Sequence, residues 1–134
     1  MQYPRKRGST SNIVHLFVPD SSSLTGAGKT GLTNASTNLF ICLAREKTGG
    51  FQALSGSQIE TITTLGVYEA PSTSSKIRFK EVDATDAPGI YELHFHNASA
   101  NADFSASDTS AHIIISIQEQ TTTALNIGRN YEMI

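Results

Sequence analysis

Residues 18–32 read VPDSSSLTGAGKTGL, and this stretch decides between two kinds of fold. The triplet Gly28-Lys29-Thr30 matches the end of a phosphate-binding loop, whose motif is G-x-x-x-x-G-K-[ST] between a buried strand and a helix. Ser23 stands where the first glycine should be, and the residues after Thr30 are rich in Gly, Thr, Asn and Ser, which disfavour a helix interior. We therefore predict a surface loop between two strands, with no helix after it and no nucleotide site.

Short segments rich in β-branched and aromatic residues recur along the chain, bounded by Gly, Pro, Ser, Asn or Asp. Apolar and polar positions alternate within them, which is typical of antiparallel strands that bury one face. In the segment 90–96 the apolar positions are Tyr91, Leu93 and Phe95, and the polar positions are Glu92, His94 and His96. We predict strands at 13–18, 39–45, 59–64, 77–82, 90–96 and 111–118.

The turn at 86–91 has the composition of the turn before a late strand in immunoglobulin-like domains. There a corner tyrosine bonds its hydroxyl to upstream backbone, and Tyr91 is our candidate for that role. Leu93 occupies the position of the disulfide cysteine of antibody domains, so we expect aliphatic packing to close the core instead. The predicted core is Tyr91, Leu93, Phe95, Ile113 and Ile115.

Two blocks of the sequence resemble a small immunoglobulin-like domain that recurs in structural proteins of tailed bacteriophages. In that family a hydrophobic strand ends in a P-D-S-S-S-x-T-G-A-G-x-T-G-L run, found here at 19–32. A strand like the one at 39–45 follows, and a V-D-A-T-x-x-P-G-x-Y block, here at 82–91, opens a late strand. The resemblance spans about residues 12–118. It implies an all-β fold, an immunoglobulin-like β-sandwich of about seven short antiparallel strands.

Composition limits the remaining possibilities. A chain of 134 residues suffices for one core, and no apolar stretch reaches the length of a membrane span. The first residues carry charge without the apolar run of a secretory signal, so we expect synthesis in the host cytoplasm. The single cysteine, Cys42, lies in an apolar segment and is predicted to be a small buried hydrophobic residue, neither a nucleophile nor a ligand.

Histidines and carboxylates are the residues that could carry catalysis or hold a metal. His94 and His96 share one face of a strand, and His112 would join them if the last predicted strand paired with theirs, giving the three imidazoles of a zinc site. The commoner alternative, which we adopt, is solvated histidines on a polar strand face. Asp83 and Asp86 fit turn positions that accept backbone N–H bonds. We predict no catalytic, metal or cofactor site and no enzymatic activity, and whether the histidines bind a metal stays open.

The two ends differ from the middle of the chain. Residues 1–11 form a basic arm on a chain whose formal net charge is −2, and residues 119–134 carry more apolar side chains than a solvated tail needs. We predict an arm at 1–11, a sandwich domain at 12–118 and an extension at 119–134, with the ends ordered only by partners. The candidate partner-binding residues are Arg5, Lys6, Arg7, Leu125, Ile127, Tyr131, Met133 and Ile134.

The resemblance implies a virion structural accessory protein that binds the assembled particle, as a capsid decoration or cement protein or at the neck or tail. Its partners would be major capsid, neck or tail proteins and copies of itself. We expect neither a membrane nor nucleic acid among them. The alternative is a host-surface or carbohydrate-binding module of a tail fibre or baseplate, for which four Tyr and no Trp supply little aromatic surface. An enzyme that uses Lys29 or the histidines is the third class.

Overall fold

The computed structural model describes residues 2–5, 11–20, 22–45, 51–96, 112–119 and 125–133. For the strand residues at 2–5, 43–45, 51–52, 112–113 and 125–133 only the backbone is described. Within these ranges the regular structure is β, apart from one 3₁₀ turn, η1 (Gly56–Gln58), and there is no α-helix. The prediction of an all-β chain is thus confirmed for the described residues.

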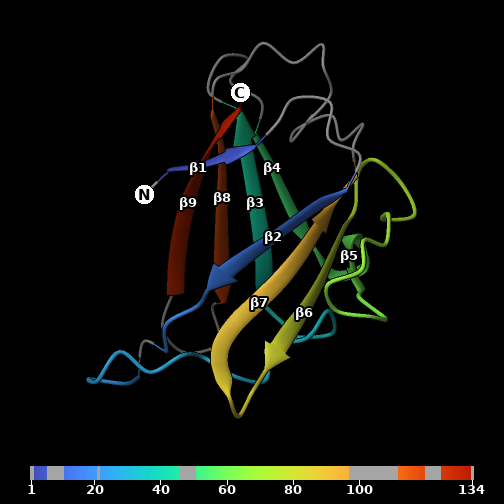
Figure 1. The fold of residues 1–134 in the computed structure, drawn as a ribbon. Helices are drawn as coiled ribbons and strands as arrows, with labels where there is room; N and C mark the ends of the chain where they lie inside the picture. The colour runs from blue at the N-terminus through green and yellow to red at the C-terminus, as the bar shows by residue number, and fades with distance from the viewer. Residues whose placement is uncertain are drawn as a thin grey trace.

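Five strands form the first sheet (Figure 1). Its order is β1 (Gln2–Arg5), β9 (Leu125–Met133), β8 (His112–Glu119), β3 (Leu39–Arg45) and β4 (Phe51–Ser55). Strand β1 runs parallel to β9, and the other neighbours are antiparallel. The central pair β3 and β8 sets Ile41 opposite Ile117, so two β-branched residues face the interior side by side.

Four strands form the second sheet, in the order β2 (Asn12–Phe17), β7 (Ala87–Phe95), β6 (Ile77–Asp83) and β5 (Ile59–Thr61). Strand β7 lies between β2 and β6 and is antiparallel to both, while the short β5 runs parallel to β6. In Figure 1 this sheet lies in front of the first. The register sets Leu93 opposite both Val14 and Phe79, so one apolar row crosses three strands.

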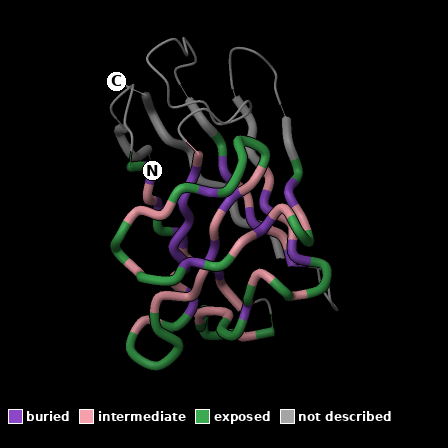
Figure 2. Tube along the Cα trace, turned by 90° about the vertical axis from the view of Figure 1, so that its right-hand side faces the viewer, coloured by how far each residue is buried: buried purple, intermediate pink, exposed green. Residues whose placement is uncertain are grey.

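The inner faces of the two sheets enclose one hydrophobic core. Of the predicted core residues, Tyr91, Leu93, Phe95 and Ile115 are buried, while only the backbone of Ile113 is described. Tyr91 stacks on Phe79 with ring centroids 4.8 Å apart. Figure 2 shows buried segments running through the interior, with exposed segments in the connecting loops. The core cluster comprises Val14, Leu16, Val18, Leu32, Leu39, Ile41, Leu54, Ile59, Ile77, Phe79, Tyr91, Leu93, Phe95, Ile115 and Ile117.

Each of the six predicted strands exists, with ends that shift by a few residues. The described residues form nine strands rather than about seven, because β1, β4 and β9 were not predicted. Two of these strands lie in the predicted arm and extension. Strand β1 pairs with β9, and residues Leu125 to Glu132 of β9 pair with β8. A strand of the predicted arm and a strand of the predicted extension are therefore neighbours in the first sheet.

The register of β9 sets two of its apolar residues opposite apolar residues of β8. Ile127 stands opposite Ile117, and Tyr131 stands opposite Ile113. Residues directly opposite in an antiparallel pair lie on the same face of the sheet, and Ile117 is buried in the core. Arg129 in turn stands opposite the buried Ile115, so the row of alternate positions in β9 is not wholly apolar.

Candidate functional site

The loop that contains Lys29 is built on backbone hydrogen bonds. The Lys29 N–H donates to the carbonyl of Val18 at 2.7 Å, and the Val18 N–H donates to the carbonyl of Gly89 at 2.8 Å. Residues 31–38 form turns rather than a helix. The predicted loop between two strands, with no helix after Thr30, is therefore confirmed. Helix N-terminal amides, which a phosphate-binding loop uses, are not part of this arrangement.

Two glycines let this loop cross the start of β7, and we call the contact between them the glycine junction. A Cβ atom on Gly28 would lie 2.0 Å from the carbonyl oxygen of Pro88. Gly89 has φ +81°, and a Cβ there would lie 2.5 Å from the Cα of Gly28 and 2.8 Å from the Val18 carbonyl oxygen. Only glycine fits either position without moving backbone. The two sequence blocks that carry the family resemblance therefore touch each other here.

The hydroxyl of Tyr91 completes the glycine junction. It donates to the carbonyl of Lys29 at 2.7 Å and accepts the Leu32 N–H at 3.2 Å. Burial, with the nearby Glu81 carboxylate, raises the pKa of Tyr91 to about 12, although the Leu32 hydrogen bond opposes the shift. Tyr91 thus bonds its hydroxyl to upstream backbone as predicted, but 62 residues upstream rather than within a local corner.

A buried carboxylate occupies the opposite face of β7. Glu92 is 1 % exposed and accepts hydrogen bonds from the Gly66 N–H at 2.9 Å, from His94 Nε2 at 2.7 Å and from His15 Nε2 at 2.9 Å. Burial raises the pKa of Glu92, but the bonds from Gly66, His94 and His15 outweigh burial, so its pKa is lowered. The carboxylate is consequently held in its charged form between two imidazoles.

Residues 62–76, which join β5 to β6 and which we call the cover, bury this carboxylate. The Glu69 N–H donates to Nδ1 of His94 at 3.1 Å, and the Tyr68 hydroxyl donates to the Phe95 carbonyl at 2.7 Å. Arg78 donates to the carbonyl of Ala70 at 3.0 Å. Polar side chains of β6 and β7 thus fasten the cover to the outer face of the sheet.

The prediction that the histidines of β7 are solvated is therefore wrong for His94, which is fully buried. The alternation correctly put Glu92 and His94 on the face opposite the core, but the cover removes that part of the face from water. His96 is half-buried at the end of β7. The sequence of β7 alone gives no indication that a segment about 25 residues earlier in the chain covers Glu92 and His94.

The three imidazoles weighed for a metal do not share one sheet. His112 belongs to β8, which pairs with β3 and β9, whereas His94 lies in the second sheet. Both ring nitrogens of His94 contact protein atoms, Glu92 on one side and Glu69 on the other. Within the described ranges no three His, Cys, Asp or Glu side chains are grouped as metal ligands would be.

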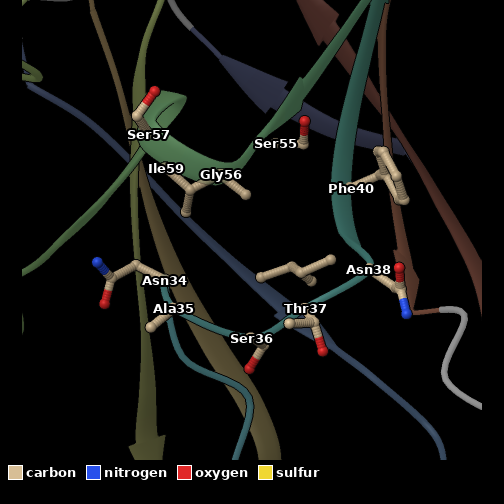
Figure 3. A pocket seen from close by; sticks show the side chains of 11 residues that line it. Asn34, Ala35, Ser36, Thr37, Asn38, Phe40, Ser55, Gly56, Ser57 and Ile59 are labelled. Carbon is tan, nitrogen blue, oxygen red and sulfur yellow. The ribbon is translucent and has the colours of Figure 1, made fainter.

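An open groove lies where the turns before β3 meet η1 (Figure 3). Its volume is about 480 Å³, within the range of sites that hold small ligands. In Figure 3 the residues at 34–37 line one side, the residues at 55–59 face them, and Asn38 and Phe40 lie toward one end. Asn38 has φ +61° and is, in the described part of the chain, the one residue other than glycine with positive φ. None of the lining residues is charged.

The groove was not predicted, because it joins two segments that are about 20 residues apart in the sequence. The only indication of the groove in the sequence is that both segments are rich in small polar residues. These are Asn34, Ser36, Thr37 and Asn38 in one segment, and Ser55 and Ser57 in the other. Such residues favour turns. Their meeting depends on the pairing of β3 with β4, a strand that was not predicted.

The other predicted residues are placed as follows. Cys42 is half-buried on the outer face of β3 rather than buried, and burial raises the pKa of its thiol, which keeps it protonated. Asp83 accepts the backbone N–H groups of Thr85 and Asp86 as predicted, whereas Asp86 acts there as the donor. The candidate partner-binding residues in β1 and β9 are Arg5, Leu125, Ile127, Tyr131 and Met133; Lys6, Arg7 and Ile134 lie outside the described residues.

Comparison with protein-family models, with curated proteins and with solved structures finds no match for this chain. In the part of the chain that the structure describes, no helix is long and apolar enough to cross a membrane.

Proposed function

We propose that this chain is a non-enzymatic structural accessory protein of a tailed-bacteriophage virion and that it docks on the assembled particle. The observation that carries the proposal is the loop formed by Asp20 and residues 22–27, which projects from the sheets in Figure 1 and presents a fully exposed Leu24. Its shape is maintained by its own hydrogen bonds, from the Asp20 N–H to the Ala27 carbonyl at 2.7 Å and from the Ser22 N–H to the Asp20 carboxylate at 2.9 Å.

An ordered loop with an apolar tip suits docking for a physical reason. A side chain that is fully exposed in the free protein gains about 25 cal/mol for each Å² of apolar area that a partner covers. Because the loop is already hydrogen-bonded, little conformational entropy is lost on binding. On a symmetric particle, many copies would make the same contact, and multivalent attachment makes weak contacts durable.

The strand order supports the finer part of the proposal, an immunoglobulin-like sandwich. In such domains one sheet contains strands B, E and D, and the other contains G, F and C, with C′ added beside C in variable-type domains. The order β2-β7-β6 corresponds to B-E-D, and the order β9-β8-β3-β4 corresponds to G-F-C-C′. Tyr91 and Leu93 then lie on strand E, whereas the corner tyrosine and the disulfide cysteine with which they were compared lie on strand F. The glycine junction adds support, since it joins the two blocks on which the resemblance rests.

The environment of the ionisable groups supports a role other than catalysis. Glu92 and His94 bind each other and the cover, and Glu60 bonds to Ser72 and Lys76. Groups that hold a segment in place in this way act as structural fasteners. The ends of the chain remain a second predicted attachment region, which the backbone course of β1 and β9 leaves untested.

Copy number tests the proposal. We expect the chain in purified particles, either at a ratio near that of the major shell protein, as for a decoration protein, or at six, twelve or a small multiple, as for a neck or tail protein. Quantitative mass spectrometry of gradient-purified particles measures this ratio. Leu24→Asp should reduce loading several-fold, whereas Val67→Asp, which places the same charge at an exposed apolar position of the cover, should not. Absence from particles, or equal loading of both variants, contradicts the proposal.

A further inference from the structure

We propose that the open groove between the turns at 34–38 and η1 is a binding site for a neutral saccharide. The inference does not depend on the proposed virion role, because it concerns the chemistry of the groove walls. It assigns to this chain a ligand class that the docking loop does not require.

The polar groups of the walls have the character that sugar hydroxyls need. Thr37, Asn38 and Ser57 are exposed, and Asn34 is half-buried. In the described part of the chain these four side chains make no hydrogen bond to protein, so their amide and hydroxyl groups face the groove or solvent with donors and acceptors free. Amides and hydroxyls both donate and accept, as do the hydroxyls of a sugar ring. A charged ligand would find no opposite charge among the lining residues.

The rest of the lining is apolar and suits the carbon face of a sugar ring. Leu39 and Ile59 lie beneath the groove and are almost fully buried, so the accessible apolar surface comes from the exposed Ala35 and from the half-buried Phe40, which lies toward one end (Figure 3). Binding sites combine apolar surface with a few placed polar groups in this way. An aromatic ring packs well against the C–H groups of a saccharide because its face is electron-rich. Phe40 is the only aromatic residue of the groove, so we expect weak binding per site.

The walls are also preorganised. Ser36 accepts the Thr33 N–H at 2.9 Å and so fixes the turn that precedes the groove. Asn38 adopts φ +61°, a conformation that costs energy for a residue other than glycine and that asparagine tolerates best. On the other side, Gln58 accepts the Ser55 N–H at 3.3 Å across η1. Both polar walls are thus held before a ligand arrives.

The test is a titration of the isotope-labelled full chain, followed by backbone amide NMR signals. The probes are β-1,4-linked oligomers of glucose and of N-acetylglucosamine and an α-linked mannose trisaccharide, with sialylated and sulfated oligosaccharides as charged counterparts. We expect saturable shifts with at least one neutral probe, centred on residues 34–40 and 55–59. Absence of saturable shifts with every neutral probe, shifts centred elsewhere, or tighter binding of the charged probes would overturn the proposal.

Two variants separate the groove from the rest of the surface. Ser57→Tyr fills the groove and should weaken binding at least tenfold. Ser74→Tyr places the same side chain on an exposed serine of the cover and should leave affinity unchanged. Thr37→Tyr, from the opposite wall, repeats the test if Ser57→Tyr disturbs the amide spectrum as a whole. Equal affinity of a folded groove variant and the wild type would refute the site. None of these measurements uses a particle, so their outcome is independent of the docking proposal.

Discussion

The glycine junction and the cover meet opposite faces of the same strand, β7, and are held by different forces. At the junction, Gly28 and Gly89 pack backbone on backbone, and any added atom collides with main chain. At the cover, Glu92, His94 and Arg78 reach out to main-chain groups of an overlying segment. The first contact depends on the absence of side chains, and the second depends on the charge and length of side chains. We therefore expect them to respond differently to substitution and to pH.

The largest effect should come from the junction. Gly89→Ala places a Cβ 2.5 Å from the Gly28 Cα at a residue with φ +81°, so backbone must move, and we expect a loss of about 3 kcal/mol or more in the free energy of unfolding. Gly31→Ala is the matched control, because Gly31 has φ +80° but open space around it, and it should cost only about 1 kcal/mol. Urea unfolding compares the two. Equal losses would show that conformation, and not the close approach, makes glycine necessary.

Loss of the buried charge should come next. Glu92→Gln removes an ionised acceptor from Gly66, His94 and His15 and should cost about 2 kcal/mol. Amide hydrogen exchange should localise the effect: the Gly66 and Glu69 amides of the cover should lose protection much more than the Leu32 amide of the junction. A uniform loss of protection would mean that the cover and the junction unfold as one unit.

Two tyrosines allow the regions to be compared with the same substitution. Tyr91→Phe removes a donor from the Lys29 carbonyl and an acceptor from the Leu32 N–H, both at the junction. Tyr68→Phe removes only a donor from the Phe95 carbonyl, at the cover. We expect about 1 kcal/mol for Tyr91→Phe and about half of that for Tyr68→Phe, measured by thermal unfolding. A larger loss for Tyr68→Phe would reverse the ranking.

The smallest effect should depend on pH. Burial raises the pKa of Glu60, but hydrogen bonds from Ser72 and Lys76 outweigh it and lower the pKa from 4.5 to about 2. Because the folded pKa is the lower one, Glu60 stabilises the fold above about pH 4.5, and this contribution is lost as the pH falls toward 2. Solvent screens the ion pair between Glu60 and Lys76. We therefore expect Glu60→Gln to lower the free energy of unfolding by only about 0.5 kcal/mol at pH 7 and not at all near pH 2. Asp86→Asn, in the exposed turn before β7, is the control, and a pH-independent cost for Glu60→Gln would contradict the assignment.

The features that were predicted correctly from the sequence are those that depend on neighbouring residues, namely strands, their buried faces and the absence of a helix after Thr30. Alternation in 90–96 and 111–118 identified strands and the faces that carry Leu93 and Ile115, because side-chain direction in a strand has a period of two. The run of Gly, Ser and Thr after Thr30 excluded a helix because those residues disfavour helix interiors. A weaker alternation exists at Leu125, Ile127, Tyr131 and Met133, but Arg129 interrupts it, and the Gly and Asn residues between them made the segment resemble a tail.

What the sequence did not predict depends on contacts between distant segments. Glu92 and His94 have the polar identity of a solvated face, and only the cover, bonded through Gly66 and Glu69, makes them interior groups. The groove likewise requires the turn at 34–38 to meet Ser55 and Ser57. The sequence shows Gly28 and Gly89 in two separate glycine-containing blocks. Their close contact depends on the positions of the strands in the folded chain, which the sequence does not give.

The glycine junction also bears on how the chain folds as it is synthesised. The Tyr91 hydroxyl bonds to a carbonyl 62 residues earlier, and among the strands that the structure describes β2 pairs with β7 alone. Ribosomes add about 5–20 residues per second, so β2 waits several seconds for its partner. Pairings this far apart in sequence must first overcome the entropy of closing a long loop, and domains dominated by them fold in milliseconds to seconds. During that interval, the backbone donors and acceptors of β2 have no native strand to pair with and stay open to pairing with other chains.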